Sequence, residues 1–285
     1  MHHLILGYGY CGYYLAQKLL KNGQQVTALS RHLDPQLQLP QLKHVLHDLN
    51  QSFTWHDSDT ILYYLIPPPS LGETDIFLNQ FLSKNEIKVK KVVYFGSSAV
   101  YGDHQGAWVN EQSNCIINNS RQLRRIDAEQ QWLTYCNERN IVPVLLRIAG
   151  IYGPCRIPVE AAQAQIPLID RDKASYTNHI YVKDLATIAF LLAQSQNSNS
   201  LYNIADGNPH PMGTLQQLTA SALGIEQAPF ESWSQAWERA SPMKREFMQD
   251  SKRLNIERLK QSLGAELILT DLKQAIQESI YHQLC

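Results

Sequence analysis

The chain has 285 residues, of which 44% are hydrophobic, so it can bury a large core in one big domain or two smaller ones. A formal net charge of −1 leaves no broad basic surface for a phosphate backbone, which argues against nucleic acid as a partner. The longest apolar run, residues 61–66, is far shorter than the roughly 20 residues of a membrane span. No basic leader precedes the first apolar run, so we expect a soluble cytoplasmic protein without membrane partners.

The cysteines and histidines form no metal-binding pattern. The cysteines are scattered, odd in number and without a CxxC pair, which argues against a disulfide framework or a zinc site and fits a reducing compartment. They are Cys11, Cys115, Cys136, Cys155 and Cys285. His44 and His47 are three residues apart on an expected strand, so their side chains face opposite sides. We therefore predict no metal site.

The first elements in chain order form a glycine-rich turn between a strand and a helix. The apolar run 4–6 predicts a strand, and the leucine spacing after it predicts a helix that ends near Asn22. Gly23 then provides a left-handed cap before a second strand at 25–30. Three glycines between the first strand and the helix have the GxGxxG spacing of a dinucleotide-binding turn.

Each glycine of this turn has its own expected task. Gly7 permits a tight turn, Gly9 lets a pyrophosphate approach the backbone, and Gly12 lets the helix pack on the sheet. The N-terminus of the helix adds unpaired N–H groups and a partial positive charge. We therefore expect a dinucleotide to be held by Gly7, Gly9, Tyr10, Cys11 and Gly12.

The residues after the second strand bear on the choice of dinucleotide. NAD sites place a carboxylate here for the ribose 2′-hydroxyl, whereas NADP sites offer an arginine or small polar groups to the 2′-phosphate. This strand ends in Ser30, Arg31 and His32, which favours NADP over NAD, with Arg31 and Ser30 contacting the phosphate. Asp34 keeps NAD open, because a shift of the loop would bring its carboxylate to the ribose.

Five further apolar runs predict strands separated mostly by helix-length segments, at 44–48, 60–66, 91–97, 142–149 and 201–205. This alternation requires crossover connections, so the fold class is α/β, with a Rossmann-type, doubly wound parallel sheet. Ligands of such sheets bind outside the carboxyl ends of the strands, where the glycine turn also lies.

A smaller C-terminal substrate lobe is expected beside the sheet. Several prolines follow Gly150 and predict a region of loops. Glycine and proline residues also follow Ala205, before a tail that is predicted to be largely helical. We assign residues 1–150 and 179–206 to the dinucleotide-binding domain. Residues 151–178 and 207–285 form the substrate-binding lobe.

Several stretches occur in the order of a known family: the glycine turn, SSAVYGD at 97–103, RIAGIYGP at 147–154 and HIYVKDLA at 179–186. In this order the chain resembles the extended short-chain dehydrogenase/reductase superfamily and its NAD-dependent epimerase/dehydratase family. The resemblance implies NAD(P) on the first domain, a small-molecule substrate that is often a nucleotide sugar, and a possible homodimer. It also implies that Asp48 and Leu49 contact the adenine.

The catalytic YxxxK motif of this family is absent. When Glu129 is aligned with the family's acidic residue, the tyrosine and lysine positions fall on Arg121 and Arg125. A guanidinium does not release its proton at physiological pH, so Arg121 cannot act as a phenol does. It can stabilise negative charge through paired hydrogen bonds. The chain therefore resembles the atypical branch of the superfamily.

Two interpretations of these arginines remain open. Arg121 and Arg125 share one helical face and are either directed at a ligand, or Arg125 forms a surface ion pair with Glu129. Arg147 and Arg156 are weaker candidates for holding a substrate anion, because isolated arginines near loops usually pair locally or face solvent.

Other candidates follow the fifth strand. Ser97 matches the family's hydroxyl position and Ser98 is its neighbour, although both hydroxyls can instead satisfy a turn. Tyr101 is a packing residue in the family, yet it is the first substitute acid to test. For His179 and Asp184 a structural role is favoured over direct catalysis.

The sequence therefore favours an oxidoreductase or epimerase/dehydratase-like enzyme that uses NADP(H), or else NAD(H). Ser97 orients a substrate oxygen, Arg121 stabilises negative charge, and a further residue handles the proton. The arginines suggest an anionic or nucleotide-sugar-like substrate. The alternative is a catalytically inactive dinucleotide-binding sensor or scaffold, which the absent YxxxK motif supports.

Overall fold

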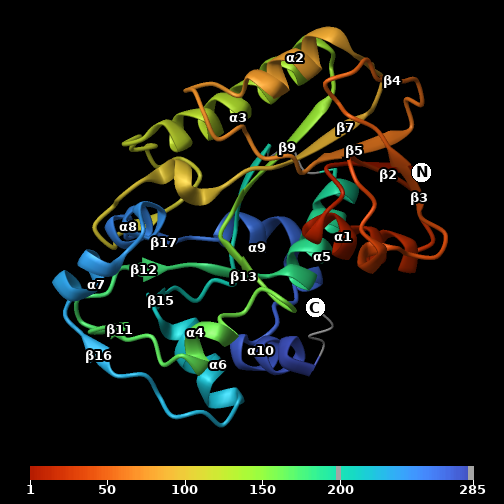
Figure 1. Cartoon of the computed structure of the whole chain (residues 1–285). Helices are drawn as coiled ribbons and strands as arrows, with labels where there is room; N and C mark the ends of the chain where they lie inside the picture. Colours follow the sequence, from red (N-terminus) through yellow and green to blue (C-terminus); the bar gives the residue numbers. More distant parts are fainter. Residues whose placement is uncertain (197–199, 282–285) are drawn as a thin grey trace.

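A computed structural model describes residues 1–196 and 200–281. Its centre is a seven-stranded sheet in the order β14-β9-β7-β5-β1-β2-β3, in which every neighbouring pair is parallel (Figure 1). The strands are β1 (His2–Leu6), β2 (Gln25–Ser30), β3 (Lys43–Leu46), β5 (Thr60–Tyr64), β7 (Lys91–Phe95), β9 (Val142–Ile148) and β14 (Leu201–Ile204). All seven predicted strands and the doubly wound α/β fold are thus confirmed, with ends that differ by up to two residues.

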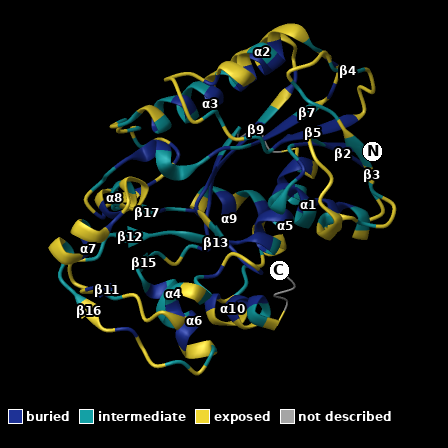
Figure 2. Cartoon of the chain, in the orientation of Figure 1, coloured by how far each residue is buried: buried dark blue, intermediate teal, exposed yellow. Residues whose placement is uncertain are grey.

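Helices cover both faces of this sheet (Figure 1). One face carries α2 (Ile76–Lys84) and α3 (Ser120–Glu138), and the other carries α1 (Tyr10–Lys21) and α5 (Val182–Gln194). Successive strand residues point to opposite faces, so Leu62 packs under α2 and α3 whereas Tyr63 packs under α1 and α5. The inner strands are therefore buried along most of their length, as Figure 2 shows, whereas the edge strand β3 has no buried residue.

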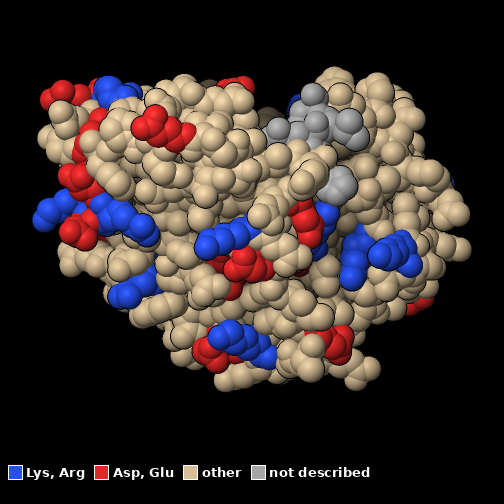
Figure 3. All heavy atoms as spheres, turned by 90° about the horizontal axis from the view of Figure 1, so that it is seen from below, with Lys and Arg blue, Asp and Glu red and all other residues tan. Residues whose placement is uncertain are grey.

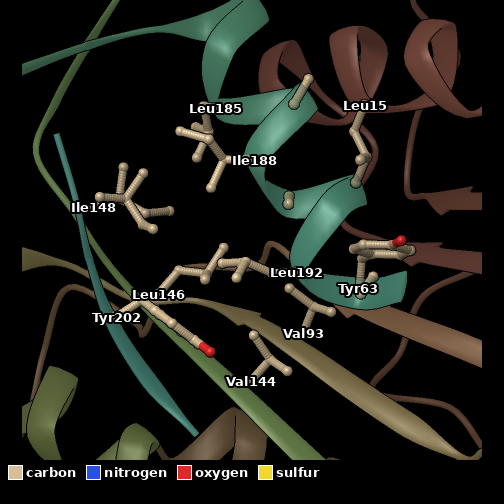
Figure 4. Packing of buried hydrophobic residues seen from close by; sticks show 14 of the residues in the cluster. Leu15, Tyr63, Val93, Val144, Leu146, Ile148, Leu185, Ile188, Leu192 and Tyr202 are labelled. Carbon is tan, nitrogen blue, oxygen red and sulfur yellow. The ribbon is translucent and has the colours of Figure 1, made fainter. Parts of the chain in front are cut away.

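The packing under α5 shows how the apolar spacing of this helix is used. Leu185, Ile188 and Leu192 lie along one face of the helix and are directed toward the strands (Figure 4). They meet Val93 and Val144 there, and each of these five side chains is at most 3% exposed. This layer fixes α5 against the sheet.

Helix α1 has the predicted limits. It begins at Tyr10, directly after the glycine turn, and its C-cap is Asn22. Gly23 follows with φ +70°, the left-handed conformation expected of a capping glycine. The turn is therefore held between the end of β1 and the first residue of the helix.

Beyond the sheet, short strands and helices form the remaining structure. The paired short strands are β4 (Thr54–Trp55) with β6 (Glu86–Ile87), β10 (Gly150–Tyr152) with β13 (His179–Tyr181), β11 (Leu168–Ile169) with β16 (Phe230–Glu231), β12 (Tyr176–Thr177) with β15 (His210–Pro211), and β17 (Arg253–Leu254) with β8 (Trp108–Val109). The helices are α4 (Val159–Gln163), α6 (Thr214–Ala222), α7 (Trp233–Arg239), α8 (Pro242–Gln249), α9 (Glu257–Leu263) and α10 (Leu272–Tyr281), with short 3-10 helices η1 (Pro35–Leu37), η2 (Ser98–Tyr101) and η3 (Gly264–Glu266).

The packing of α9 does not follow the domain boundary proposed at residue 207. Its residues Leu259 and Leu263 are buried in the same cluster as Tyr202 of the sheet. In addition, β17 pairs with β8, and Arg253 lies opposite Trp108, a residue of the first segment. Part of the C-terminal tail therefore packs with the sheet, while α4, α6 and α10 pack with one another.

Further observations concern membrane-spanning helices, surface charge and thiols. No helix in the described ranges is long and apolar enough to cross a membrane. On the face seen in Figure 3, acidic and basic side chains are interspersed. Among the described cysteines, Cys11, Cys115 and Cys136 are free thiols. Cys285 lies outside the described residues.

Candidate functional site

The site lies where the parallel strands end. Leu6 of β1 is paired with Leu29 of β2 and with Tyr64 of β5, so these strands stop at one edge of the sheet. Three neighbouring cavities open along this edge. We call them the strand-end cavity, the glycine-turn cavity and the inter-lobe cavity, with volumes of about 340, 520 and 360 Å³.

Most of the residues proposed from the sequence line one of these cavities. The strand-end cavity includes Gly7, Ser30, Arg31, Asp48, Leu49 and Pro67. The glycine-turn cavity includes Gly7, Gly9, Tyr10, Cys11, Gly12, Pro67, Ser97, Arg125, Ile148, Ala149 and Arg156. The inter-lobe cavity includes Ser97, Ser98, Arg121, Ile148, Ala149, Tyr176, His179, Glu246, Phe247, Asp250 and Lys252. Shared residues make the three cavities continuous, with Gly7 and Pro67 at the first junction and Ser97, Ile148 and Ala149 at the second.

The glycines of the turn meet different surroundings. Gly7 has φ +91°, and a Cβ there would lie 2.7 Å from Cγ1 of Ile66. A Cβ on Gly12 would lie 3.1 Å from the Tyr8 ring, so this glycine lets the helix approach the turn. A Cβ on Gly9 would meet nothing within 4 Å. The open side of Gly9 gives a ligand room to reach the backbone at the N-terminus of α1.

The strand-end cavity presents one cation without a partner. Ser30 already donates its hydroxyl hydrogen bond to the His32 carbonyl at 2.6 Å, so it is not a free phosphate donor. Arg31 has no carboxylate partner in the described part of the chain. Asp34 caps η1 by accepting from the Gln36 N–H and does not line this cavity. The arrangement places the arginine, rather than the Asp34 carboxylate, beside the cavity.

Two more cations without carboxylate partners line the glycine-turn cavity. The Nε atom of Arg125 is buried and has no hydrogen-bond partner among residues 1–196 and 200–281. Burial, followed by the neighbouring charges of Arg121 and Arg124, lowers the pKa of Arg125. The Arg156 guanidinium stacks 4.1 Å from the centre of the Tyr10 ring. Two guanidiniums near a helix N-terminus form a strong site for a diphosphate.

The predicted alternative pairing of Arg125 with Glu129 is wrong. Glu129 instead accepts a bidentate set of hydrogen bonds from Arg147, with Nη2–Oε2 at 2.8 Å and Nε–Oε1 at 3.1 Å. Both side chains are buried, at 7% and 5% exposed. The candidate role of Arg147 in holding a substrate anion is therefore also wrong, because a buried carboxylate already occupies its donors.

Tyr101 lies in the core and does not line the inter-lobe cavity. Its hydroxyl donates to the Asn203 side chain at 2.7 Å, and burial raises its pKa to about 12. The Arg147 guanidinium covers its ring at 4.8 Å. These contacts correct its candidate role as a substitute acid, since the phenol is committed to packing and to Asn203.

The inter-lobe cavity joins the sheet to the C-terminal segment. Ser97 caps η2 by accepting from the Ala99 N–H at 3.2 Å, so its hydroxyl hydrogen is available to a ligand. Arg121 pairs with Glu246 of α8 at 3.2 Å, and its guanidinium lies 5.1 Å from the Phe247 ring centre. This pair weakens the sequence argument for an anionic substrate, because Arg121 already faces a carboxylate.

Sequence reasoning missed Glu246, Asp250 and Lys252, which all line this cavity. They come from a polar helical tail in which no motif marked them. His179, which was proposed to be structural, also lines the cavity, and burial lowers its pKa to about 4. Its imidazole is therefore neutral at pH 7, and its buried Nδ1 has no hydrogen-bond partner among the described residues. Asp184 accepts hydrogen bonds from Thr270, in agreement with a structural role.

The parallel sheet, the glycine turn at a helix N-terminus and the cavities at the strand ends define a Rossmann-type α/β protein. Residues 78–205 match the model of the NAD dependent epimerase/dehydratase family. This match covers the middle of the chain and agrees with the resemblance to that family seen in the motifs.

Solved structures share this fold along the whole chain. A functionally unknown conserved protein from Silicibacter pomeroyi is 25% identical, with a TM-score of 0.81 and 100% of this chain and 99% of that chain covered. UDP-glucuronic acid 4-epimerase from Bacillus cereus in complex with NAD is 17% identical, with a TM-score of 0.76 and full coverage of both chains. UDP-glucose 4-epimerase from Thermotoga maritima is 16% identical, with a TM-score of 0.76 and 99% and 98% covered. Curated protein sequences gave no match.

Proposed function

We propose that the chain binds a nicotinamide dinucleotide along the strand ends and acts as an oxidoreductase or epimerase/dehydratase-like enzyme on a small molecule in the inter-lobe cavity. The observation that carries this proposal is the continuity of the cavities. Ser97, Ile148 and Ala149 line both the glycine-turn cavity and the inter-lobe cavity. A dinucleotide in the first cavity would therefore border a substrate in the second.

The residues of this chain fit such a dinucleotide. Its pyrophosphate would be held by the N–H groups at the start of α1 and by the cations of Arg125 and Arg156. Asp48 and Leu49 would contact the adenine, and Arg31 would contact a 2′-phosphate, which favours NADP. When bound, the dinucleotide supplies or accepts a hydride. The Bacillus cereus structure is a complex with NAD, so NAD is the second candidate.

The chain would use residues other than a tyrosine–lysine pair on the substrate. Ser97 and Ser98 would donate hydrogen bonds to a substrate oxygen at the end of β7. Arg121 would stabilise negative charge there once a ligand replaces Glu246 as the partner of its guanidinium. Two related folds belong to enzymes of UDP-sugars, which places nucleotide sugars among the substrates to test.

The first experiment measures dinucleotide binding by the fluorescence of NADPH and NADH at equal ionic strength. We expect tighter binding of NADPH, and Arg31→Ala should weaken NADPH binding about tenfold while NADH binding stays within twofold, since only NADPH carries the phosphate. Arg139→Ala, at an exposed arginine that lines none of the three cavities, is the matched control. Tighter NADH binding by the wild type would refute the NADP preference.

The second experiment tests turnover. Deuterium transfer to or from C4 of the nicotinamide is followed with UDP-glucose, UDP-glucuronic acid and small carbonyl compounds. Transfer that falls at least tenfold in Arg121→Ala supports an enzyme of this site. Tight dinucleotide binding with no transfer to any compound would favour the catalytically inactive sensor or scaffold. A possible homodimer can be examined on the same samples by light scattering.

A further inference from the structure

One side chain of the inter-lobe cavity is a buried cation with unused donors. Lys252 precedes β17 and is 7% exposed. Its ammonium donates to the Gly102 carbonyl at 3.0 Å, and the nearest Asp250 oxygen is 3.9 Å away, too far for a hydrogen bond. A lysine ammonium carries three donors. Within the described ranges only one is used, which leaves donors for a ligand oxygen in the cavity that Lys252 lines.

The position of this ammonium relates it to the serines. Gly102 ends η2, the short helix that begins at Ser98 and is capped by Ser97. Lys252 is therefore fixed to the same segment that carries both hydroxyls, and all three side chains belong to one cavity. Ser97 also lines the glycine-turn cavity, so this group of donors borders the proposed dinucleotide site.

The other titratable groups of the cavity are less suited to exchange a proton. Glu246 is paired with Arg121, and His179 is held neutral by burial. Asp250 accepts a hydrogen bond from Gln122 at 3.1 Å. These groups leave Lys252 and a phenol as the remaining candidates.

The phenol is that of Tyr176, whose ring lines the cavity but is held in a stack with an arginine. The Arg253 guanidinium lies 4.9 Å from its ring centre, and the ring edge contacts the loop at Gly106. Arg253 itself donates to the Gly106 carbonyl, which holds this stack together. The exposed Lys260 of α9 serves as the matched comparison for Lys252 in the experiments.

We propose that Lys252 is the catalytic residue that exchanges a proton with the substrate oxygen, the task for which the family uses a tyrosine. This proposal rests on the proposed function. In the direction of reduction, the carbonyl carbon would receive the hydride that a bound dinucleotide would supply. One N–H bond of the ammonium breaks, the carbonyl π electrons form the new O–H bond, and a neutral amine remains that solvent reprotonates. In the direction of oxidation, the neutral amine accepts the hydroxyl proton.

The surroundings of Lys252 favour this exchange. Burial lowers its pKa, while the nearby carboxylates of Asp250 and Asp103 oppose that shift. The net direction is downward, so the ammonium releases its proton more readily than an ordinary lysine does. A lysine of lowered pKa is a suitable acid and base near neutral pH.

A substrate-independent experiment decides the proposal. The pKa of the Lys252 ammonium is measured by NMR on 13C,15N-lysine-labelled protein saturated with NADP+ and then with NADPH, and Lys252→Met assigns the signal. A lysine at the reacting centre should titrate at least 0.5 pH units lower with NADP+, because the oxidised nicotinamide ring is positively charged and disfavours a second cation nearby. Equal pKa values in the two complexes would overturn the proposal.

The other charged groups need a check, because they also titrate or act on Lys252. The carboxylates near Lys252 are those of Asp103, Asp250 and Glu246, and His179 and Arg121 line the same cavity. The same titration in Asp250→Asn should lower the Lys252 pKa further in both complexes, since an opposing carboxylate is lost. The difference between the NADP+ and NADPH complexes should remain.

Turnover provides the second arm, with deuterium transfer from [4-²H]NADPH to the uncharged probe diacetyl. Lys252→Met and Lys252→Arg should both lose at least 100-fold in rate, because neither side chain releases a proton, whereas Lys260→Met, at an exposed lysine that lines none of the three cavities, should stay within threefold. A Lys252→Arg variant of wild-type rate would show that only charge or packing matters and would overturn the proposal. If the wild type transfers no deuterium to diacetyl, the titration decides on the criterion above.

Binding measurements separate this proposal from the proposed function. Lys252→Met should bind NADPH as the wild type does, with Tm recorded to exclude misfolding. A wild type that binds neither dinucleotide refutes the proposed function and this inference together. A wild type that binds NADPH, with a Lys252 pKa that does not respond to the oxidation state of the dinucleotide, refutes this inference alone.

Discussion

Two arginine–glutamate pairs show how differently the two sides of the site are built. Arg147 and Glu129 lie inside the sheet domain, 7% and 5% exposed, with a bidentate geometry. Arg121 and Glu246 span from α3 to α8, 30% and 38% exposed, through one contact at 3.2 Å. The buried pair fixes β9 to α3, whereas the half-exposed pair can exchange a partner with a ligand. The sheet side of the site is thus a fixed frame. On the side of α8, by contrast, the contacts of the cavity can change when a ligand binds.

The largest expected effect is on the buried pair. Arg147→Met should lower the free energy of unfolding by about 3–5 kcal/mol, because Glu129 is left as a buried and unpaired charge. Urea unfolding measures this, with Arg139→Met as an exposed control expected to cost less than about 1 kcal/mol. A loss below about 1 kcal/mol in Arg147→Met would contradict the view that the sheet side is a fixed frame.

The next effect concerns the glycine turn of the same frame. Gly7→Ala should weaken NADPH binding by about 100-fold, roughly 2.7 kcal/mol, because the Cβ would lie 2.7 Å from Ile66 and the backbone is at φ +91°. Gly23→Ala has a similar positive φ of +70° with nothing within 4 Å, so it isolates the backbone strain from the clash. Fluorescence titration should find Gly23→Ala binding unchanged. Equal losses in both variants would mean that general destabilisation, not the turn, is being measured.

The contrast between the two regions also explains what the sequence could predict. The strands and the glycine turn depend on local spacing, since an apolar run or three glycines within six residues carry their own signal. The partner of Glu129 depends on how α3 lies against β9, which the sequence does not state. The contacts of Arg121 and Lys252 join residues 125 and 150 positions apart along the chain. Such contacts form only through the tertiary fold, so the charged residues of the inter-lobe cavity could not be found beforehand.

An effect of intermediate size is expected at the junction of the two regions. Asp206 follows β14, its Oδ2 atom is buried without a partner in the described chain, and burial raises its pKa to about 6. An unfolded aspartate titrates near 3.9, so the folded state binds the extra proton between these values. Stability from this group is therefore full below about pH 4 and is lost as the pH rises through about 6.

Replacing Asp206 by asparagine tests this sign. Asp206→Asn should raise the free energy of unfolding by about 2–3 kcal/mol at pH 7.5 and leave it unchanged near pH 3.5, because the amide stays neutral at both pH values. The amide oxygen can still accept the hydrogen bond from the Asn208 N–H, which keeps the turn. Denaturant titrations of wild type and variant at the two pH values measure the difference. A constant difference across the range would show that Asp206 is ionised at both.

The smallest effect is expected at the half-exposed pair. Glu246→Gln should change the free energy of unfolding by no more than about 1 kcal/mol, because solvent screens a pair of this exposure. It also leaves Arg121 without its carboxylate, so calorimetry on the NADPH complex should show UDP-glucuronic acid binding severalfold more tightly than to the wild type. Glu238→Gln, an exposed residue of α7, should change neither quantity. A loss above about 2 kcal/mol would instead make this pair a structural clamp like that of Arg147, and the contrast between the two regions would fail.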